Sequence, residues 1–401
     1  MKLTIKKGVM NGEVDAVSSK SYAHRYIISS MLSESDSVLY NVYKSEDILA
    51  TLGAIKFFNK SYKEDNGMHI FNKECNEDVV IDCNESGSTL RFLIPIALVK
   101  FGHAKFIGKE TLFNRGLDVY LKIFEDNNIS YVLTDDSLEF EGTLKDDTFY
   151  IPGNISSQYI TGLLFSLPLL NFDTKIVLTT ELESKNYIDI TLEVLKNSGI
   201  NIDVIDNTYI IKGNQHYNLT SATIEGDYSN ASFFEAFNYL GSNIKINGLN
   251  PDSLQGDKVF KKYFHDLNEK FCTIDISNCI DLGPVLFTFA SMKKGGRFTG
   301  TKRLRIKESD RVDSITDELK KCGASINVYD DEVIIKKSKL HNPFISLNGH
   351  NDHRVVMSLS LLSSLFTITI DQAEAVSKSY PTYFKELARL GLDVEDEDVT
   401  K

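Results

Sequence analysis

Residues 303–328 read RLRIKESDRVDSITDELKKCGASINV, and this stretch decides the fold. From Asp313 onward, Ile315 and Leu319 are spaced to lie on one face of a helix. Gly323 follows at the point where helices often end in a residue with positive φ, and an alternating segment comes next. The stretch therefore predicts an amphipathic helix that is followed by a strand.

The same pattern occurs six times along the chain. Besides the copy at residue 313, copies begin at residues 47, 118, 189, 257 and 381, at intervals of 56 to 71 residues. Each copy starts with an acidic residue or a proline and has a glycine or asparagine near the end of its helix. Six copies at near-constant spacing indicate an α/β protein that is built from repeats. Generic alternation of helices and strands, without related units, is the alternative.

Composition indicates a globular protein with room for two domains. The chain has 401 residues, a hydrophobic content of 42% and a formal net charge of −12. The acidic balance argues against nucleic acid as a partner, because binding to a phosphate backbone needs a basic face. No apolar run reaches the roughly 18 residues of a membrane-spanning helix, and the N-terminus does not read as a signal peptide. Five scattered cysteines without a CxxC pair predict reduced thiols and a cytoplasmic location.

The first part of the opening stretch predicts a strand that leads into a helix. Leu304 and Ile306 alternate with basic residues, which is typical of a short strand over 303–307 with one buried face. Ser309 or Asp310 would cap the helix, because a short side-chain oxygen can accept hydrogen bonds from the N–H groups of the first turn.

Charged residues lie around this predicted junction. A helix N-terminus favours anions, so Lys307 and Arg311 beside it predict an anion-binding site. Glu308, held among these cations, is a candidate for proton transfer. A solvated charged turn at the start of a helix is the alternative.

Other predicted helices also begin with polar residues that suit an anion. These residues are Lys20, Ser21 and Arg25, then Gly87 and Arg91, then Ser156, Ser157 and Gln158, then Ser184, and finally Arg354 and Lys378. Ordinary helix caps are the alternative at each place. Asp281 precedes the apolar run LGPVLFTFA, where a carboxylate with a raised pKa can act as a base, or simply cap the helix. His350 and His353 lack a nearby third ligand, which argues against a metal site.

Eight short motifs, in this order and spacing, closely resemble the 5-enolpyruvylshikimate-3-phosphate synthase family over essentially the whole chain. They are SKSYAHR at 19–25, ESGSTLR at 85–91, ISSQYITGLL at 155–164, SKNYIDIT at 184–191, EGDYSNAS at 225–232, KESDR at 307–311, NDHR at 351–354 and SKSYP at 377–381. The resemblance implies an α/β fold of two domains, the inside-out α/β barrel of the enolpyruvyl transferases, with six repeated βαβαββ-type units. The first domain would comprise residues 1–18 and 225–401 and the second residues 19–224, with the active site in the cleft between them.

The resemblance implies a reaction and a set of site residues. The enolpyruvyl group of phosphoenolpyruvate would be transferred to the 5-hydroxyl of shikimate 3-phosphate, which releases phosphate, in the shikimate pathway to chorismate and the aromatic amino acids. Asp281 would take the hydroxyl proton, and Glu308 would protonate the methylene carbon and later remove that proton, with Lys20 as a third catalytic residue. Contacts to shikimate 3-phosphate would come from Lys20, Ser21, Arg25, Ser156, Ser157, Gln158, Ser184, Tyr187, Asp281 and Lys307. Contacts to phosphoenolpyruvate would come from Lys20, Gly87, Arg115, Gln158, Arg311, Arg354 and Lys378.

The resemblance implies no metal and no organic cofactor. The expected partners are the two small-molecule substrates, without nucleic acid or membrane, and the expected state is a monomer. The inhibitor glyphosate would occupy the phosphoenolpyruvate site near Gly87.

Three residues depart from the usual pattern of the family. Glu85 stands where Asn is usual, beside the expected phosphate of phosphoenolpyruvate, so that its charge could weaken anion binding. Arg303 stands where many members have Asn, and Asn186 replaces a common Pro.

Two alternative functions remain open. The sister enzyme that transfers enolpyruvate to UDP-N-acetylglucosamine usually carries a cysteine near the position of Arg115, and residues 109–115 contain none. A non-catalytic repeat protein that binds phosphorylated ligands would show no turnover.

Overall fold

The computed structural model describes residues 1–75 and 80–397 as two compact units. Unit 1 comprises Met1–Val17 and Gly226–Lys401, and unit 2 comprises Ser18–Glu225. The chain thus leaves unit 1 once and returns once. That the two units are the functional domains expected from the sequence, with a site between them, stays a prediction.

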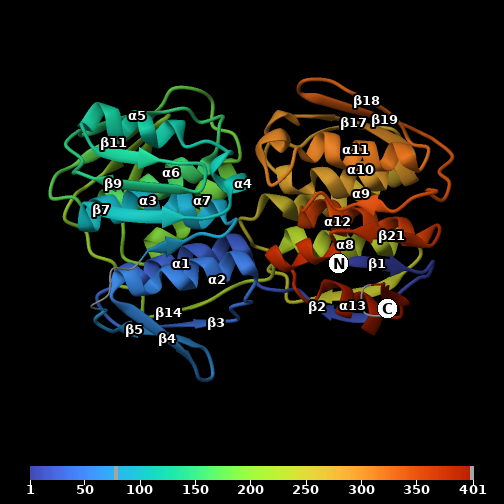
Figure 1. The fold of residues 1–401 in the computed structure, drawn as a ribbon, viewed down its shortest axis with the longest axis horizontal. Helices are drawn as coiled ribbons and strands as arrows, with labels where there is room; N and C mark the ends of the chain where they lie inside the picture. Colours follow the sequence, from blue (N-terminus) through green and yellow to red (C-terminus); the bar gives the residue numbers. More distant parts are fainter. Residues whose placement is uncertain (76–79, 398–401) are drawn as a thin grey trace. The chain divides into compact units, whose positions relative to one another are not determined.

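Unit 2 contains three four-stranded sheets with one pairing pattern (Figure 1). In each sheet the first two strands are parallel and the later pairs are antiparallel. The first sheet has the order β14 (Ser221–Thr223), β3 (Ser37–Tyr40), β5 (Met68–Asn72), β4 (Lys60–Glu64). The second has β6 (Ile81–Asp82), β7 (His103–Ile107), β9 (Ser137–Glu141), β8 (Ser130–Leu133). The third has β10 (Thr148–Ile151), β11 (Thr174–Leu178), β13 (Thr208–Ile211), β12 (Ile202–Ile205).

Unit 1 repeats this pattern with one change. One sheet has the order β16 (Thr273–Asp275), β17 (Gly295–Thr299), β19 (Glu332–Lys336), β18 (Ser325–Val328). A second has β20 (Leu347–Asn348), β21 (Ile368–Asp371), β1 (Lys2–Ile5), β22 (Val394–Asp396), so that strands from both ends of the chain share it. The third is a parallel pair of β15 (Asn243–Asn247) and β2 (Asn11–Asp15).

Two kinds of helix alternate with these strands. Helices that are buried around most of their circumference are α1 (Lys20–Leu32), α3 (Gly87–Phe101), α6 (Ser157–Ser166), α8 (Tyr228–Tyr239), α10 (Gly283–Met292) and α12 (His353–Ser360). Helices with one buried face are α2 (Glu46–Gly53), α5 (Asp118–Asn127), α7 (Lys185–Asn197), α9 (Phe260–Glu269), α11 (Arg311–Lys321) and α13 (Tyr383–Arg389). In the described part of the chain, no helix combines the length and apolar character needed to cross a membrane.

The helices pack together inside each unit and the sheets lie outside them. In unit 2, α3 packs against α2 and α6, and α7 packs against α1 and α6. Gly162 of α6 permits this close approach, because a Cβ there would lie 2.5 Å from the carbonyl oxygen of Arg91 in α3. Strands β8 and β12 each expose three of their four residues. The predicted α/β repeat architecture is confirmed.

The predicted strand over 303–307 is wrong. Lys302–Ile306 forms a 3₁₀-helix, η5, in which Leu304 is buried but Ile306 is 47% exposed. The physical reason is that β17, the preceding strand, already pairs with β16 on one side and β19 on the other, so the segment that follows cannot pair with it as a hairpin.

Several predicted helix starts are displaced. Lys20 and Ser21, which the sequence suggested would lie just before their helix, are the first two residues of α1. Asp189 lies in the second turn of α7, and Asp257 lies in the 3₁₀-helix η3 (Gly256–Val259) that precedes α9. Periodicity locates the apolar face of a helix better than its first residue, because the terminal turn depends on capping.

Candidate active site

Acidic side chains cap or precede the helices of unit 1. Asp227 accepts a hydrogen bond from the backbone N–H of Asn230 at the start of α8, and Asp352 accepts one from the N–H of Arg354 at the start of α12. Asp310, one of the two predicted caps, accepts bonds from the first turn of α11. Asp281 lies in the short 3₁₀-helix η4 (Ile280–Leu282) before α10.

Arg311 is the centre of a buried ionic cluster. Its side chain is 2% exposed and contacts three carboxylates. Nη1 lies 2.9 Å from Asp281, Nη2 lies 2.6 Å from Glu308, and Nε lies 2.8 Å from Asp352. Burial would lower the pKa of this guanidinium, but Asp352, Glu308 and Asp281 together raise it above its ordinary value. The arginine therefore stays charged and fixes the two carboxylates that the sequence selected, Asp281 and Glu308.

Asp281 is a charged carboxylate in this cluster. Burial would raise its pKa, but Lys307, Arg311 and Arg354 outweigh burial and hold the pKa well below the ordinary value. The Lys307 Nζ lies 3.4 Å from Oδ1 of Asp281, and the Arg354 Nη2 lies 3.7 Å from Oδ2. The raised pKa expected from burial alone is therefore wrong, because the sequence did not show that three cations converge on this side chain.

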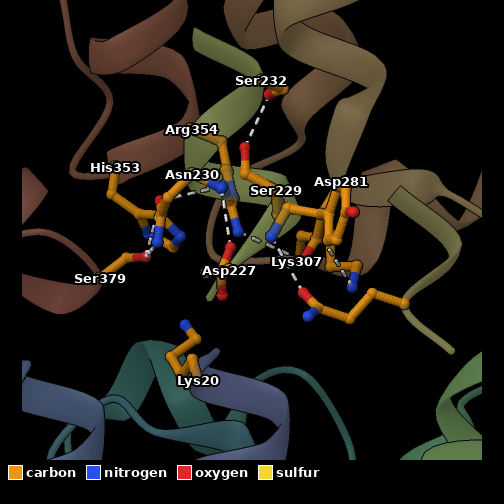
Figure 2. Close-up of polar contacts among 12 residues, drawn as sticks. Lys20, Asp227, Ser229, Asn230, Ser232, Asp281, Lys307, His353, Arg354 and Ser379 are labelled. Atoms are coloured by element: carbon orange, nitrogen blue, oxygen red, sulfur yellow. Dashed lines mark hydrogen bonds and ion pairs between the residues drawn. The ribbon is translucent and has the colours of Figure 1, made fainter. Parts of the chain in front are cut away.

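Arg354 extends the cluster towards α8 and the C-terminal part of unit 1. Its Nη1 donates to Oδ1 of Asn230 at 3.3 Å, and Asn230 also donates to Ser379 at 3.2 Å (Figure 2). The Nε–H of Arg354 is buried and has no hydrogen-bond partner among residues 1–75 and 80–397. Lys378 donates to the backbone carbonyl of Asn351 at 2.5 Å. These cations, taken together, suit an anionic ligand.

The entrance of α1 in unit 2 collects a second group of predicted residues. Lys20 pairs with Asp47 at 2.7 Å. Arg25 donates to the carbonyl oxygens of Ser21 at 2.7 Å and of Tyr187 at 3.1 Å. Burial lowers the pKa of Arg25 to about 10, which leaves it charged at neutral pH. Arg25 thus joins α1 to the entrance of α7.

The entrance of α3 collects a third group. A Cβ built on Gly87 would lie 2.9 Å from Nη1 of Arg115 and 3.0 Å from Nη1 of Arg91. Arg91 also donates to Oε1 of Gln158 at 3.0 Å and to the carbonyl oxygens of Arg115 and Gly116. Two guanidinium groups therefore flank the bare face of Gly87, where an anion can approach the helix N-terminus.

Serines occupy the entrances of α6 and α7. Ser156 caps α6 by accepting a bond from the N–H of Gln158, and Ser157 is the first residue of that helix. Ser184 precedes α7, is fully buried and has a φ of 54°. Its carbonyl accepts a bond from the N–H of Tyr187 at 3.1 Å.

The structure therefore brings the predicted residues together within each unit. Unit 1 gathers Asp281, Lys307, Glu308, Arg311 and Arg354 around one guanidinium, with Lys378 linked through the segment before α12. Unit 2 gathers the predicted residues of α1 and α7, and separately those of α3 and α6. Sequence reasoning gave no role to Asp352, although it lies in the NDHR motif, or to Asp47, whose only signal was an acid at the start of a helix.

The structure shows the surroundings of the three residues that depart from the usual pattern of the family. Glu85 is 9% exposed and pairs with Lys109 at 2.9 Å, so a cation offsets its charge. Arg303 is buried in η5, and Asn186 lies in the first turn of α7.

Comparisons with known proteins point to one family. The sequence model described as EPSP synthase (3-phosphoshikimate 1-carboxyvinyltransferase) matches residues 5–387. A relative named 3-phosphoshikimate 1-carboxyvinyltransferase, from Clostridium beijerinckii, is 40% identical over 424 residues and 97% of each chain. A relative of the same name from Clostridioides difficile is 40% identical over 438 residues, 100% of this chain and 99% of its own.

Solved structures share the fold. An EPSP synthase from Acinetobacter baumannii has a TM-score of 0.77 at 21% identity, over 98% of this chain and all of its own. The enolpyruvyl transferase NikO from Streptomyces tendae has a TM-score of 0.78 at 14% identity, over 98% of both chains. The enolpyruvyl transferase fold implied by the motifs is thereby confirmed.

Proposed function

Because this chain belongs to the EPSP synthase (3-phosphoshikimate 1-carboxyvinyltransferase) family, we propose that the clusters at its helix entrances carry out the reaction of that family. The chain is a transferase of the shikimate pathway, which moves the enolpyruvyl group of phosphoenolpyruvate to shikimate 3-phosphate. The observation that supports the residue roles best is Arg311, which holds two carboxylates on different nitrogens.

Asp281 is the base in this proposal. The neighbouring cations hold its pKa well below the ordinary value, so it is charged at neutral pH and can accept the proton of the 5-hydroxyl. Lys307, which contacts the same carboxylate, would orient the hydroxyl-bearing substrate.

Glu308 is the acid in this proposal. Its carboxyl group delivers a proton to the methylene carbon of phosphoenolpyruvate, which makes the neighbouring carbon cationic. The 5-hydroxyl oxygen then bonds to that carbon while its proton passes to Asp281, and a tetrahedral intermediate results. Glu308 next removes a proton from the new methyl group, the carbon–oxygen bond to phosphate breaks, and the enol ether forms. The two carboxylates thus exchange protons with different substrate atoms.

The cationic residues bind the anionic groups of the substrates. We assign phosphoenolpyruvate to Lys20, Gly87, Arg115, Gln158, Arg311, Arg354 and Lys378. We assign shikimate 3-phosphate to Lys20, Ser21, Arg25, Ser156, Ser157, Gln158, Ser184, Tyr187, Asp281 and Lys307. These sets draw on both units, so the proposal includes a site between the two domains. The buried Nε–H of Arg354, which has no partner in the described residues, supports a bound anion in unit 1.

The oligomeric state, the location and the requirements of the enzyme are also part of the proposal. We infer a monomer in the cytoplasm that needs only its two small-molecule substrates. The five cysteines are free thiols, as reduced proteins have. Sedimentation of the active enzyme tests the oligomeric state.

The deciding experiment measures phosphate release with each substrate omitted in turn. Release should require both shikimate 3-phosphate and phosphoenolpyruvate. Glu308→Gln and Asp281→Asn should each lower kcat by about 10²-fold or more, which is typical when a general acid or base is lost. Asp317→Asn, an exposed change on α11, is the matched control and should leave kcat unchanged. Equal release with UDP-N-acetylglucosamine in place of shikimate 3-phosphate would overturn the substrate assignment, and near-normal kcat in both carboxylate variants would overturn their roles.

A further inference from the structure

Asp257 is a buried carboxyl group for which the proposed mechanism has no use. It lies in η3 and is 6% exposed. Its Oδ1 is buried and has no hydrogen-bond partner in the part of the chain that the structure describes. A carboxylate that served only as a helix cap would place its oxygens on backbone N–H groups, so capping does not explain this side chain.

The position of Asp257 is fixed beside the cluster of unit 1. The neighbouring Gln255 accepts a bond from the N–H of Tyr228 at 3.0 Å and donates to the carbonyl of Gly226 at 2.8 Å. These bonds tie η3 to the entrance of α8, where Asp227 is the cap. The 3₁₀-helix η4, which carries Asp281, also packs against α8.

Four charged side chains from different elements act on Asp257. Asp281 and Asp227 oppose its ionisation, whereas Arg354 and Lys307 favour it, and Figure 2 shows these four residues in one cluster. Burial is the largest influence and, with Asp281, raises the pKa of Asp257 to about 8. The pKa of Asp281 is held well below its ordinary value. When two interacting carboxyl groups have pKa values pushed apart in this way, one of them is charged while the other is protonated.

We propose that Asp257 is a positioning residue of the active site, a carboxyl group that stays protonated while the enzyme works and weakens the binding of the anionic substrates when it ionises. The inference rests on the proposed function of the surrounding cluster. An ionised Asp257 would place a further negative charge among groups that bind anions. It would also oppose the charged state of Asp281, which has to remain a proton acceptor.

The first test compares pH profiles of kcat/KM for phosphoenolpyruvate at saturating shikimate 3-phosphate. In the parent enzyme, loss of the Asp257 proton should lower kcat/KM as pH rises above about 8. In Asp257→Asn, a neutral side chain of the same shape, the ratio of kcat/KM at pH 9.5 to that at pH 7 should exceed the parent ratio by about tenfold. Asp266→Asn is the matched control, because Asp266 lies on the adjacent helix α9 and pairs with Lys262; its profile should follow the parent. An alkaline fall in Asp257→Asn equal to that of the parent would overturn the proposal.

The second test needs no substrate and therefore separates this inference from the proposed function. The folded pKa of Asp257 lies above the ordinary 3.8, so the stability that its proton contributes is lost as pH rises through about 8. Asparagine does not titrate. The Tm of Asp257→Asn minus that of the parent should therefore increase from pH 5 to pH 8.5. The same difference for Asp266→Asn should stay flat in this window, because Lys262 lowers the pKa of Asp266. A flat difference for Asp257→Asn would overturn the protonated state.

Discussion

At the scale of single residues, Gly87 shows how one missing side chain makes room for an anion. It begins α3, and a Cβ built on it would lie 2.9 Å from a guanidinium nitrogen of Arg115 and 3.0 Å from one of Arg91. Its backbone is helical rather than left-handed, so alanine is sterically allowed by the main chain. Substitution by alanine should therefore affect ligand binding and the positions of the two arginine side chains, but not the fold.

Gly87→Ala should weaken phosphoenolpyruvate binding. An added methyl in a close-packed contact costs about 1–3 kcal/mol, which corresponds to roughly 5- to 150-fold in KM. Glyphosate, the longer ligand, should lose more affinity than phosphoenolpyruvate. Gly53→Ala is the control, because a Cβ at Gly53 meets no atom within 4 Å. Steady-state kinetics with varied phosphoenolpyruvate and glyphosate measure both effects; an unchanged KM in Gly87→Ala would contradict the position given to the anion.

The residues that gather in the clusters were predictable from the motifs, but the pairing of their charges was not. The sequence selected Asp281, Glu308 and Arg311 without indicating that all three meet on one guanidinium. Likewise, Glu85 looked like an added negative charge until the fold placed Lys109 beside it. Charge pairing depends on side chains brought together by tertiary structure, and a pattern of spacing along one chain does not encode these distances.

At the scale of elements, caps position the side chains that we assign to catalysis. Asp310 accepts bonds from the N–H groups of Val312 and Asp313, both at 3.1 Å, and thereby fixes the first turn of α11, which begins at Arg311. The same carboxylate pairs with Arg305 of η5 at 2.7 Å. The cap therefore connects the 3₁₀-helix and the α-helix on either side of Glu308.

Asp310→Ala should destabilise the protein by about 1 kcal/mol, the usual effect of losing an N-cap. Asp310→Asn keeps a capping oxygen and removes the charge, so it should retain most of the stability. Urea unfolding followed by circular dichroism gives both values. The kcat of Asp310→Ala should also fall, because Arg311 is the first residue of the loosened turn. Equal stability of the alanine and asparagine variants would contradict the capping role.

The helices with one buried face were predicted from the sequence as copies of one repeated pattern. The helices that are buried on most sides were not recognised as copies of any pattern. An amphipathic helix leaves a 3.6-residue period that can be aligned between copies. A helix such as α10, which is apolar on almost every face, leaves no period and was recognisable only from the polar residues before it. The error at 303–307 has a related cause, because two apolar residues in alternation do not distinguish a strand from one turn of 3₁₀-helix.

At the scale of the whole molecule, the ends of the chain complete one repeat. The antiparallel strand pairs β4–β5, β8–β9, β12–β13 and β18–β19 each follow one another in sequence. The corresponding pair in the sheet β20–β21–β1–β22 is β22–β1, with Leu3 opposite Asp396 and the N–H of Glu397 bonded to the carbonyl of Lys2. Strands β22 and β1 therefore pair as the two strands of a hairpin do, but no turn connects them.

A circular permutant should therefore fold and retain turnover. A short glycine linker would join residue 401 to residue 1, and new ends would open between Phe344 and Ile345, which are 95% and 63% exposed. The matched control carries the same linker but opens between Val333 and Ile334 inside β19, which pairs on both sides. Melting curves and phosphate release should show a folded, active first permutant and a failed second one. Failure of the first would contradict the continuity of β22 and β1.

The pairing of β1 also determines the order in which a nascent chain can fold. Residues 18–225 contain all the strands of unit 2, so this unit can fold once they have left the ribosome. Strand β1 is synthesised long before its partners β21 and β22. At about 5–20 residues per second, the interval between completing residue 225 and reaching β22 is roughly 10 to 30 seconds. Until then the first strand lacks β22, so its backbone N–H and C=O groups on that side stay open to pairing with another chain.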